Sequence, residues 1–154
     1  LMATPDVAPD GIASSPALSS IDIAPVNTRY GQEVRNHLIF LFNGGAGQPA
    51  NARYALNLSV TRSSSAAARV QVRTDNEPTS SLLTMTANYR LTDSGTGRVV
   101  ATGRRQVSSA YDVPRQEFAS LRAERDAENR AARELAEHLR LALGQDLARA
   151  GNGS

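Results

Sequence analysis

The sequence predicts an α+β fold: a two-layer sandwich of element order β-α-β-β-β-α, with two helices on one face of a mainly antiparallel sheet. Apolar residues alternate with polar ones along residues 54–61 and 83–92, which is typical of half-buried strands. Apolar residues recur at spacings of three and four along residues 28–42 and 114–150. That period indicates two helices, which flank the strands in the chain.

The size of the chain fits a single domain. It has 154 residues, of which 40% are apolar, and Ala supplies 24 of those. The larger apolar side chains therefore fill one modest core. We expect residues 1–18 to be a flexible linker, residues 19–150 to be the domain and residues 151–154 to be a flexible tail. No run approaches the roughly 20 apolar residues of a transmembrane helix.

The first predicted elements are a short strand and a helix. Residues 20–24 alternate apolar and polar side chains up to Pro25, which favours a strand that ends there. Residues 43–45 (Asn-Gly-Gly) end the helix of residues 28–42, because they tolerate positive φ. Four apolar residues of this helix share one face: Tyr30, Val34, Leu38 and Leu41.

Three strands follow. Residues 54–61 form the first, and residues 69–73 are either a lesser strand or its continuation after a Ser-rich kink. Residues 83–92 form the next, and a loop over residues 93–97 makes a hairpin with a returning strand from residue 99 to residue 111.

The last helix, over residues 114–150, shows the clearest pattern. Its apolar residues recur every four positions: Ala119, Ala123, Ala127, Ala131, Leu135, Leu139, Leu143 and Leu147. The small first half allows close approach to a sheet, and the Leu half needs deeper space. We expect its carboxylates on a solvated face, with Asp126 beside Arg130 and Glu137 beside Arg140. These carboxylates are Glu124, Asp126, Glu128, Glu134 and Glu137.

The matching periods of these elements predict one shared core. Its members are Ile21, Ile23, Val34, Leu38, Leu56, Leu58, Met85, Tyr89, Leu135 and Leu139.

Most enzyme chemistry has no candidate residues here. The chain has no Cys, and all 17 basic residues are Arg, so thiolate and Lys chemistry are excluded. His37 and His138 each lack a second His at metal-ligand spacing. The glycines of residues 44–47 follow a helix rather than open one, and no Gly-x-Ser-x-Gly motif is present. We therefore expect no catalytic residue, metal or cofactor.

Two surfaces are candidates for binding. Ile39, Phe40 and Phe42 lie off the apolar face of their helix, so we expect at least one to be exposed and to contact a partner, with core burial as the competing interpretation. The other surface is the uncovered face of the sheet, rich in hydroxyls and amides, with three Arg and no carboxylate among the listed positions. An ordinary solvent-facing sheet is the alternative there. Its predicted residues are Arg53, Asn57, Ser59, Thr61, Thr84, Thr86, Asn88, Arg90, Thr102, Arg104, Gln106 and Ser108.

Motifs along the whole domain resemble the LptE family of lipopolysaccharide-assembly lipoproteins. Residues 28–38 (TRYGQEVRNHL) resemble its r-x-G-Q-x-(V/L)-R-N-x-L helix, and residues 54–60 (YALNLSV) are similar to its second strand. Residues 87–99 carry its a-x-Y-x-L-x-D…t-G-x-v hairpin. Residues 109–136 resemble its closing strand and helix.

The resemblance implies an outer-membrane lipoprotein that faces the periplasm, is anchored by a lipidated N-terminal Cys and plugs the LptD β-barrel. The lipidated Cys is absent from this sequence, and residues 1–18 then serve as the tether. The resemblance also implies contact with lipopolysaccharide, for which Arg suits the phosphates. We expect this contact at Arg90 and Arg104, with weaker candidates at the ends of the sheet: Arg62, Arg73 and Arg105. Simple alternation points Arg105 inward. Barrel contacts are expected at Arg53, Asn57, Thr84, Thr86 and Asn88.

Two other functions compete with this one. The element order and the pI of 9.5 also suit a double-stranded-RNA-binding module, but residues 113–118, at the start of the last helix, carry one Arg and one Glu rather than a cation cluster. We therefore expect no nucleic-acid partner. An unrelated periplasmic scaffold is the third possibility.

Overall fold

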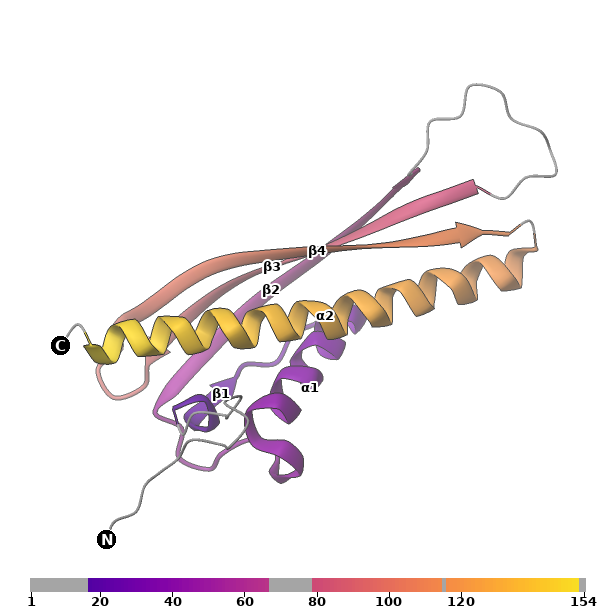
Figure 1. Ribbon diagram of the computed structural model, residues 1–154. Helices are drawn as coiled ribbons and strands as arrows, with labels where there is room; N and C mark the ends of the chain where they lie inside the picture. Colours follow the sequence, from indigo (N-terminus) through magenta and orange to yellow (C-terminus); the bar gives the residue numbers. More distant parts are fainter. Residues whose placement is uncertain (1–16, 67–78, 115, 153–154) are drawn as a thin grey trace, which may run out of the picture.

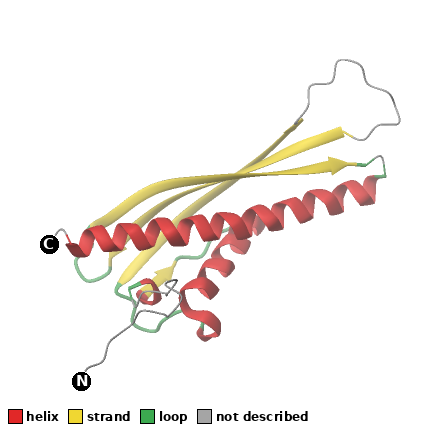
Figure 2. Ribbon diagram, viewed as in Figure 1, coloured by secondary structure: helices red, strands yellow, loops and turns green. Residues whose placement is uncertain are grey.

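The computed structural model describes residues 17–66, 79–114 and 116–152. Two helices and a four-stranded sheet form an α+β fold, with both helices on the same side of the sheet (Figures 1 and 2). The predicted fold class and element order are confirmed. The elements are the 3₁₀ turn η1 (Leu18–Ser20), β1 (Ile21–Ile23), α1 (Arg29–Asn43), the 3₁₀ turn η2 (Gly44–Ala46), β2 (Tyr54–Ala66), β3 (Thr79–Asp93), β4 (Val99–Val113) and α2 (Glu117–Asn152).

The strands lie in the order in which they occur in the chain. β2, β3 and β4 pair antiparallel, and β1 pairs parallel with the first three residues of β2. The parallel pair follows from the connection, since α1 carries the chain back along the sheet before β2 begins. The register places Leu56 opposite Leu91 and Leu91 opposite Ala101. Alternate residues of all three long strands therefore share one face.

Local signals explain the ends of α1. The Thr28 side chain accepts a hydrogen bond of 3.0 Å from the Gly31 N–H and so caps the first turn. Gly44, with φ of 61°, ends the helix in a conformation that glycine adopts without strain. The helix is thus one residue displaced from the predicted range of 28–42.

α2 runs along the sheet and packs against β4, β3 and α1 (Figure 1). Its early contacts are made by Ala127 and Ala131, and its later ones by Leu135, Leu139 and Leu143, all of which are buried. The predicted apolar stripe is therefore confirmed from Ala127 onward, whereas Ala119 and Ala123 are only half-buried.

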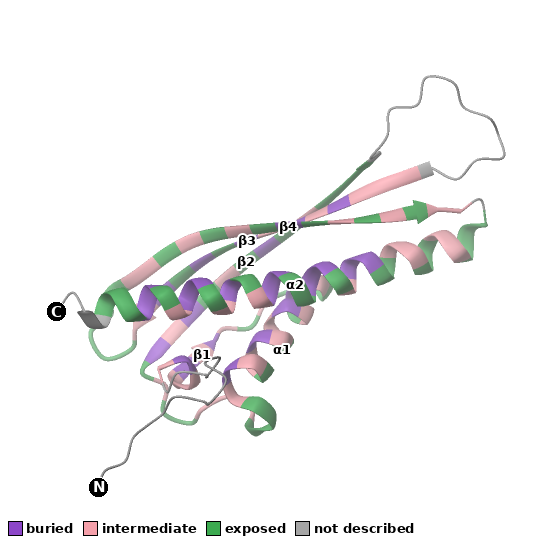
Figure 3. Ribbon diagram, viewed as in Figure 1, coloured by how far each residue is buried: buried purple, intermediate pink, exposed green. Residues whose placement is uncertain are grey.

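The core lies between the helices and the sheet, where the facing sides are buried in Figure 3. Every residue of the predicted core is buried except Leu58, which is half-buried against it. Val60, Leu83 and Leu91 complete the sheet side, and Phe42 and Leu143 complete the helix side.

Some boundaries and faces differ from the predictions. Leu18, the last residue of the expected linker, is only 3% exposed and belongs to the core. α2 continues to Asn152, into the expected tail. Glu128 is buried rather than solvated, and Arg130 bonds Ser109 and the Ala110 carbonyl of β4 rather than Asp126. The possible strand at residues 69–73 lies outside the described residues.

Candidate ligand-binding face and partner surface

The face of the sheet that the helices leave open is polar, as predicted. Its positions on β2, β3 and β4 are exposed or half-buried in Figure 3. Cross-strand neighbours bond each other: the Thr84 and Ser108 hydroxyls lie 3.0 Å apart, and the Thr86 hydroxyl donates to Gln106 Oε1 at 3.1 Å. These bonds join hydroxyl and amide groups of β3 and β4 across the open face.

Two exposed arginines lie together on this face. Arg90 of β3 stands between Asn57 of β2 and Thr102 of β4, and Arg104 of β4 stands beside Asn88 of β3. In this register the two arginines are diagonal neighbours, and their Cα atoms are roughly 7–8 Å apart. Within the described part of the chain neither guanidinium forms an ion pair. The pair can therefore bind an anion with both forks free.

Two carboxylates also lie on this face, which the predicted list of positions omitted. Asp22 pairs with Ala55 at the β1 edge, and Asp112 pairs with Ser80 at the far end of β4. Both follow the outward alternation of their strands. The face is therefore cationic in the middle and acidic at two of its corners.

Arg62 lies on the opposite, helix-covered side of the sheet. Its guanidinium pairs with Glu124 and, at 2.8 Å, with Glu128 of α2, while Arg29 of α1 reaches the other Glu128 oxygen at 2.7 Å. Burial lowers the pKa of Arg62, but the hydrogen bonds and charges of the two carboxylates outweigh it, so the pKa lies above its ordinary value. Arg62 thus joins β2 to α2 and is separated from Arg90 and Arg104.

The structure places the remaining predicted arginines as follows. Arg105 lies opposite Ala87 on the helix-covered side, and its Nη1 donates to the Arg104 carbonyl at 2.7 Å. Arg53 directly precedes β2, with its guanidinium carbon 5.2 Å from the centre of the Tyr54 ring. Arg73 lies outside the described residues.

Sequence analysis missed the Arg29–Glu128–Arg62 cluster. Glu128 was assigned to a solvated charge run, although it lies one four-residue step before Ala132 and two before Ala136, which are buried. That spacing is the signal that marks Glu128 as facing the core.

The end of α1 presents one large exposed apolar side chain. Phe40 is 62% exposed, Ile39 packs partly against the core and Phe42 is buried. Phe118 and Leu121 on the first turns of α2 are also exposed. Phe40 is therefore the member of the predicted trio that can reach a partner.

The described residues hold no cluster of His, Cys, Asp and Glu suited to a metal ion. No helix among them is long and apolar enough to cross a membrane.

Residues 18–143 match the family model described as LptE, lipopolysaccharide-assembly. The chain belongs to the LptE family. The match covers every element from η1 through most of α2, and it favours lipopolysaccharide assembly over RNA binding and over an unrelated scaffold. Among curated protein sequences none matches significantly.

Solved structures share the LptE fold seen here. A putative lipoprotein from Caulobacter crescentus is 32% identical, with a TM-score of 0.68 over 86% of this chain and 93% of that one. Rare lipoprotein B from Shewanella oneidensis is 13% identical, with a TM-score of 0.60 over 84% of this chain and 95% of its own. A minor lipoprotein from Acinetobacter baumannii is 16% identical, with a TM-score of 0.57 over 78% and 84% of the two chains. The last two are similar in fold alone.

Proposed function

We propose that this protein is a non-enzymatic lipopolysaccharide-assembly lipoprotein that binds lipopolysaccharide on its open sheet face and plugs the LptD β-barrel. Membership of the LptE family supports the process. The observation that carries the binding site is the exposed, unpaired pair of Arg90 and Arg104 among amides and hydroxyls.

The chemistry of this surface suits a phosphorylated sugar. Each guanidinium offers a planar fork to two phosphate oxygens, and two arginines one diagonal apart can share one phosphate or hold two. Thr102 lies directly opposite Arg90 and can bond a sugar hydroxyl. Arg62 takes no part, since Glu124 and Glu128 already occupy its guanidinium.

Lipopolysaccharide binding by an Arg90→Ala, Arg104→Ala double variant tests this site. We expect binding to fall at least tenfold at low salt, with an unchanged melting temperature. A matched control, Arg98→Ala with Arg133→Ala, removes the same charge from exposed positions elsewhere. Equal binding by the parent and the Arg90→Ala, Arg104→Ala variant would exclude the sheet face as the binding site. Equal losses of binding in both double variants would show that only the net charge of the protein matters.

We place the LptD contact on the open face and on Phe40. A face of hydroxyls and amides around a cationic centre suits the polar lumen of a large barrel. Exposed Phe40 supplies an apolar anchor of the kind that dominates interfaces. Arg53, Asn57, Thr84, Thr86 and Asn88 are the proposed polar contacts.

Co-purification with LptD tests this contact. Phe40→Asp should reduce recovery of the complex while the isolated chain melts as the parent does, because Phe40 contributes little to the core. Leu141→Asp, on an exposed position of α2, is the matched control and should leave recovery unchanged. Full recovery with Phe40→Asp would exclude this residue from the interface.

We also place the protein at the outer membrane, facing the periplasm, with its lipid anchor on a Cys upstream of residue 1. The residue sequence encoded ahead of Leu1 tests this directly, since the proposal requires a Cys behind a signal peptide.

A further inference from the structure

One edge of β2 lies open where β1 ends. The last bond between the two strands is donated by the Ala24 N–H to the Leu56 carbonyl at 2.9 Å, and the chain then leaves the sheet at Pro25. β2 continues for ten residues beyond Leu56, up to Ala66. Along that stretch the sheet contains no strand beside β2 on this edge within the described residues.

The open edge carries unpaired backbone groups. Because the Leu56 carbonyl points to the β1 side, the N–H and C=O groups of Leu58 and Val60 point to that side too. Within the described chain none of these four groups has a hydrogen-bond partner on this edge. These groups recur at every second residue, as in any β-strand, so a second extended chain can pair with them.

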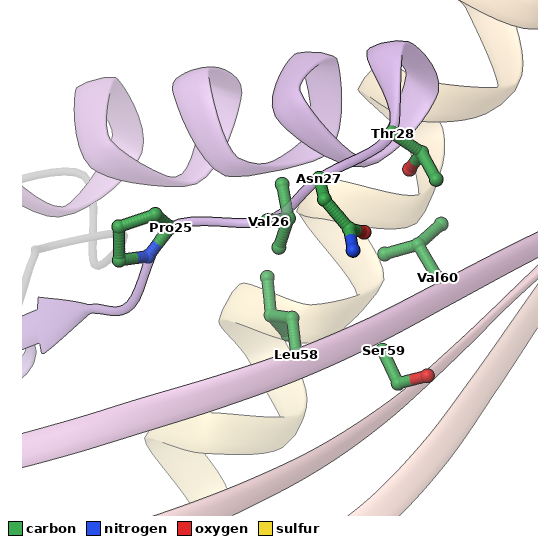
Figure 4. Close-up of a pocket in the computed structure, with 7 residues that line it drawn as sticks. All are labelled: Pro25, Val26, Asn27, Thr28, Leu58, Ser59 and Val60. Atoms are coloured by element: carbon green, nitrogen blue, oxygen red, sulfur yellow. The ribbon is translucent and has the colours of Figure 1, made fainter.

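A cleft of about 380 Å³ lies against this edge. Leu58–Val60 line one side of the cleft. The linker from Pro25 to Thr28, which connects β1 to α1, lines the other side. Figure 4 shows the side chains of Val26 and Asn27 on the linker facing β2, with Ser59 turned to the other side. The walls are therefore part apolar and part amide, beside a free backbone edge.

The neighbouring edge of the sheet is closed by side chains. On β1, Gln48 accepts from the Ile23 N–H at 3.2 Å and donates to the Ile23 carbonyl at 2.9 Å, and Arg35 donates to the same carbonyl. The fold thus blocks strand addition at β1, as natural sheets do at exposed edges. Among the described residues, no side chain bonds the edge groups of Leu58 and Val60 in this way.

We propose that an extended segment of a partner polypeptide adds to β2 at Leu58 and Val60, in the place in the sheet that β1 leaves. Unpaired donors and acceptors in register favour a peptide backbone over a lipid chain or a small molecule, which cannot match them. Arg62 is turned inward to Glu124 and Glu128. An inward charge disfavours strand pairing, so Arg62 limits the stretch of β2 to which the segment can pair. The segment is short, and the site is independent of lipopolysaccharide binding.

A tethered peptide tests the site whatever the natural partner is. The chain has no cysteine, so Asn27→Cys gives one thiol at the rim of the cleft. The probe is an alternating Thr-Val heptapeptide joined to it by a disulfide through a Gly-Gly spacer, at millimolar effective concentration. The first control is the same peptide at residue 27 with every backbone nitrogen methylated, which keeps the side chains but removes the donors. The second is the unmodified peptide on Gln145→Cys, an exposed site on α2.

The readout is amide hydrogen exchange of the full chain. We expect the amides of Leu58 and Val60 to exchange at least tenfold more slowly with the unmodified peptide at residue 27, and to be unaffected in both controls. Leu58→Pro, which deletes a donor of the open edge together with a half-buried side chain, should abolish the protection of Val60. Leu58→Ala, which loses the side chain but keeps the donor, should retain it. Absence of protection would overturn the proposal. Equal protection by the methylated peptide would overturn it too, because the cleft would then hold side chains rather than a strand.

Discussion

Tyr89 of β3 donates a hydrogen bond of 2.6 Å to Asp146 of α2 and so joins the sheet to the helix inside the core. Both residues are buried, and Arg149, one turn along α2, pairs with the same carboxylate. Burial raises the pKa of Tyr89 to about 12, and the hydrogen bond to Asp146 and its negative charge act in the same direction. The neutral phenol is therefore part of the folded state.

This contact predicts a loss of stability at high pH. The pKa of Tyr89 rises from 10.0 when unfolded to about 12 when folded, so its contribution is complete below pH 10 and disappears as the pH climbs through 12. Tyr89→Phe should lower the free energy of unfolding by about 1–2 kcal/mol near neutral pH. Urea denaturation of parent and variant from pH 8 to 12 measures this. The prediction fails if the difference between them stays constant across that range.

Gly103 is required by the same tyrosine. It lies opposite Tyr89 in the register, and a Cβ atom there would overlap the Tyr89 ring and hydroxyl. Gly103→Ala should therefore destabilise the fold by about 1–3 kcal/mol. Gly144→Ala is the matched control: it lies in α2 with nothing within 4 Å of the new methyl group, and it should stabilise by about 0.5–1 kcal/mol. Thermal melts that shift in the same direction for both would contradict the packing.

The buried cluster around Glu128 should be sensitive to charge removal. Glu128→Gln keeps the size of the side chain but leaves Arg62 with Glu124 alone, and it removes the carboxylate that Arg29 pairs with. We expect a loss of about 1.5–3 kcal/mol, as for hydrogen bonds to charged groups. Glu134→Gln, whose contact with His138 is 3.8 Å and exposed, should change stability by less than about 0.5 kcal/mol. Equal urea midpoints for the two variants would show that the cluster is solvated.

Leucines two residues apart on α2 should behave in opposite ways. Leu139 is fully buried, and Leu139→Ala should lower the free energy of unfolding by about 2–5 kcal/mol through lost burial and a cavity. Leu141 is 56% exposed, so Leu141→Ala should fall within about 0.5 kcal/mol of the parent. A thermal melt unchanged by Leu139→Ala would contradict the position of the core.

The sequence by itself determined which face of each long strand is buried. Alternation placed Leu56, Met85 and Tyr89 inward and Arg90 and Arg104 outward, and the structure agrees. The four-residue step of α2 placed Leu135 and Leu139 against the sheet in the same way. These features are local, since the period of a strand or helix fixes the direction of every side chain relative to its neighbours.

The tertiary structure alone decided which residues meet across those faces. The four-residue spacing puts Glu128 on the core face of α2, but its charge is neutralised by Arg62 and Arg29, which lie 66 and 99 residues away in the chain. No local pattern predicts those two partners. The burial of Tyr89 likewise requires two distant residues: Gly103, which leaves room for its ring, and Asp146, which accepts its hydrogen bond. The open edge of β2 exists because β1 ends after three residues while β2 runs for thirteen. Contacts between distant elements depend on how the layers pack, which periodicity leaves undetermined.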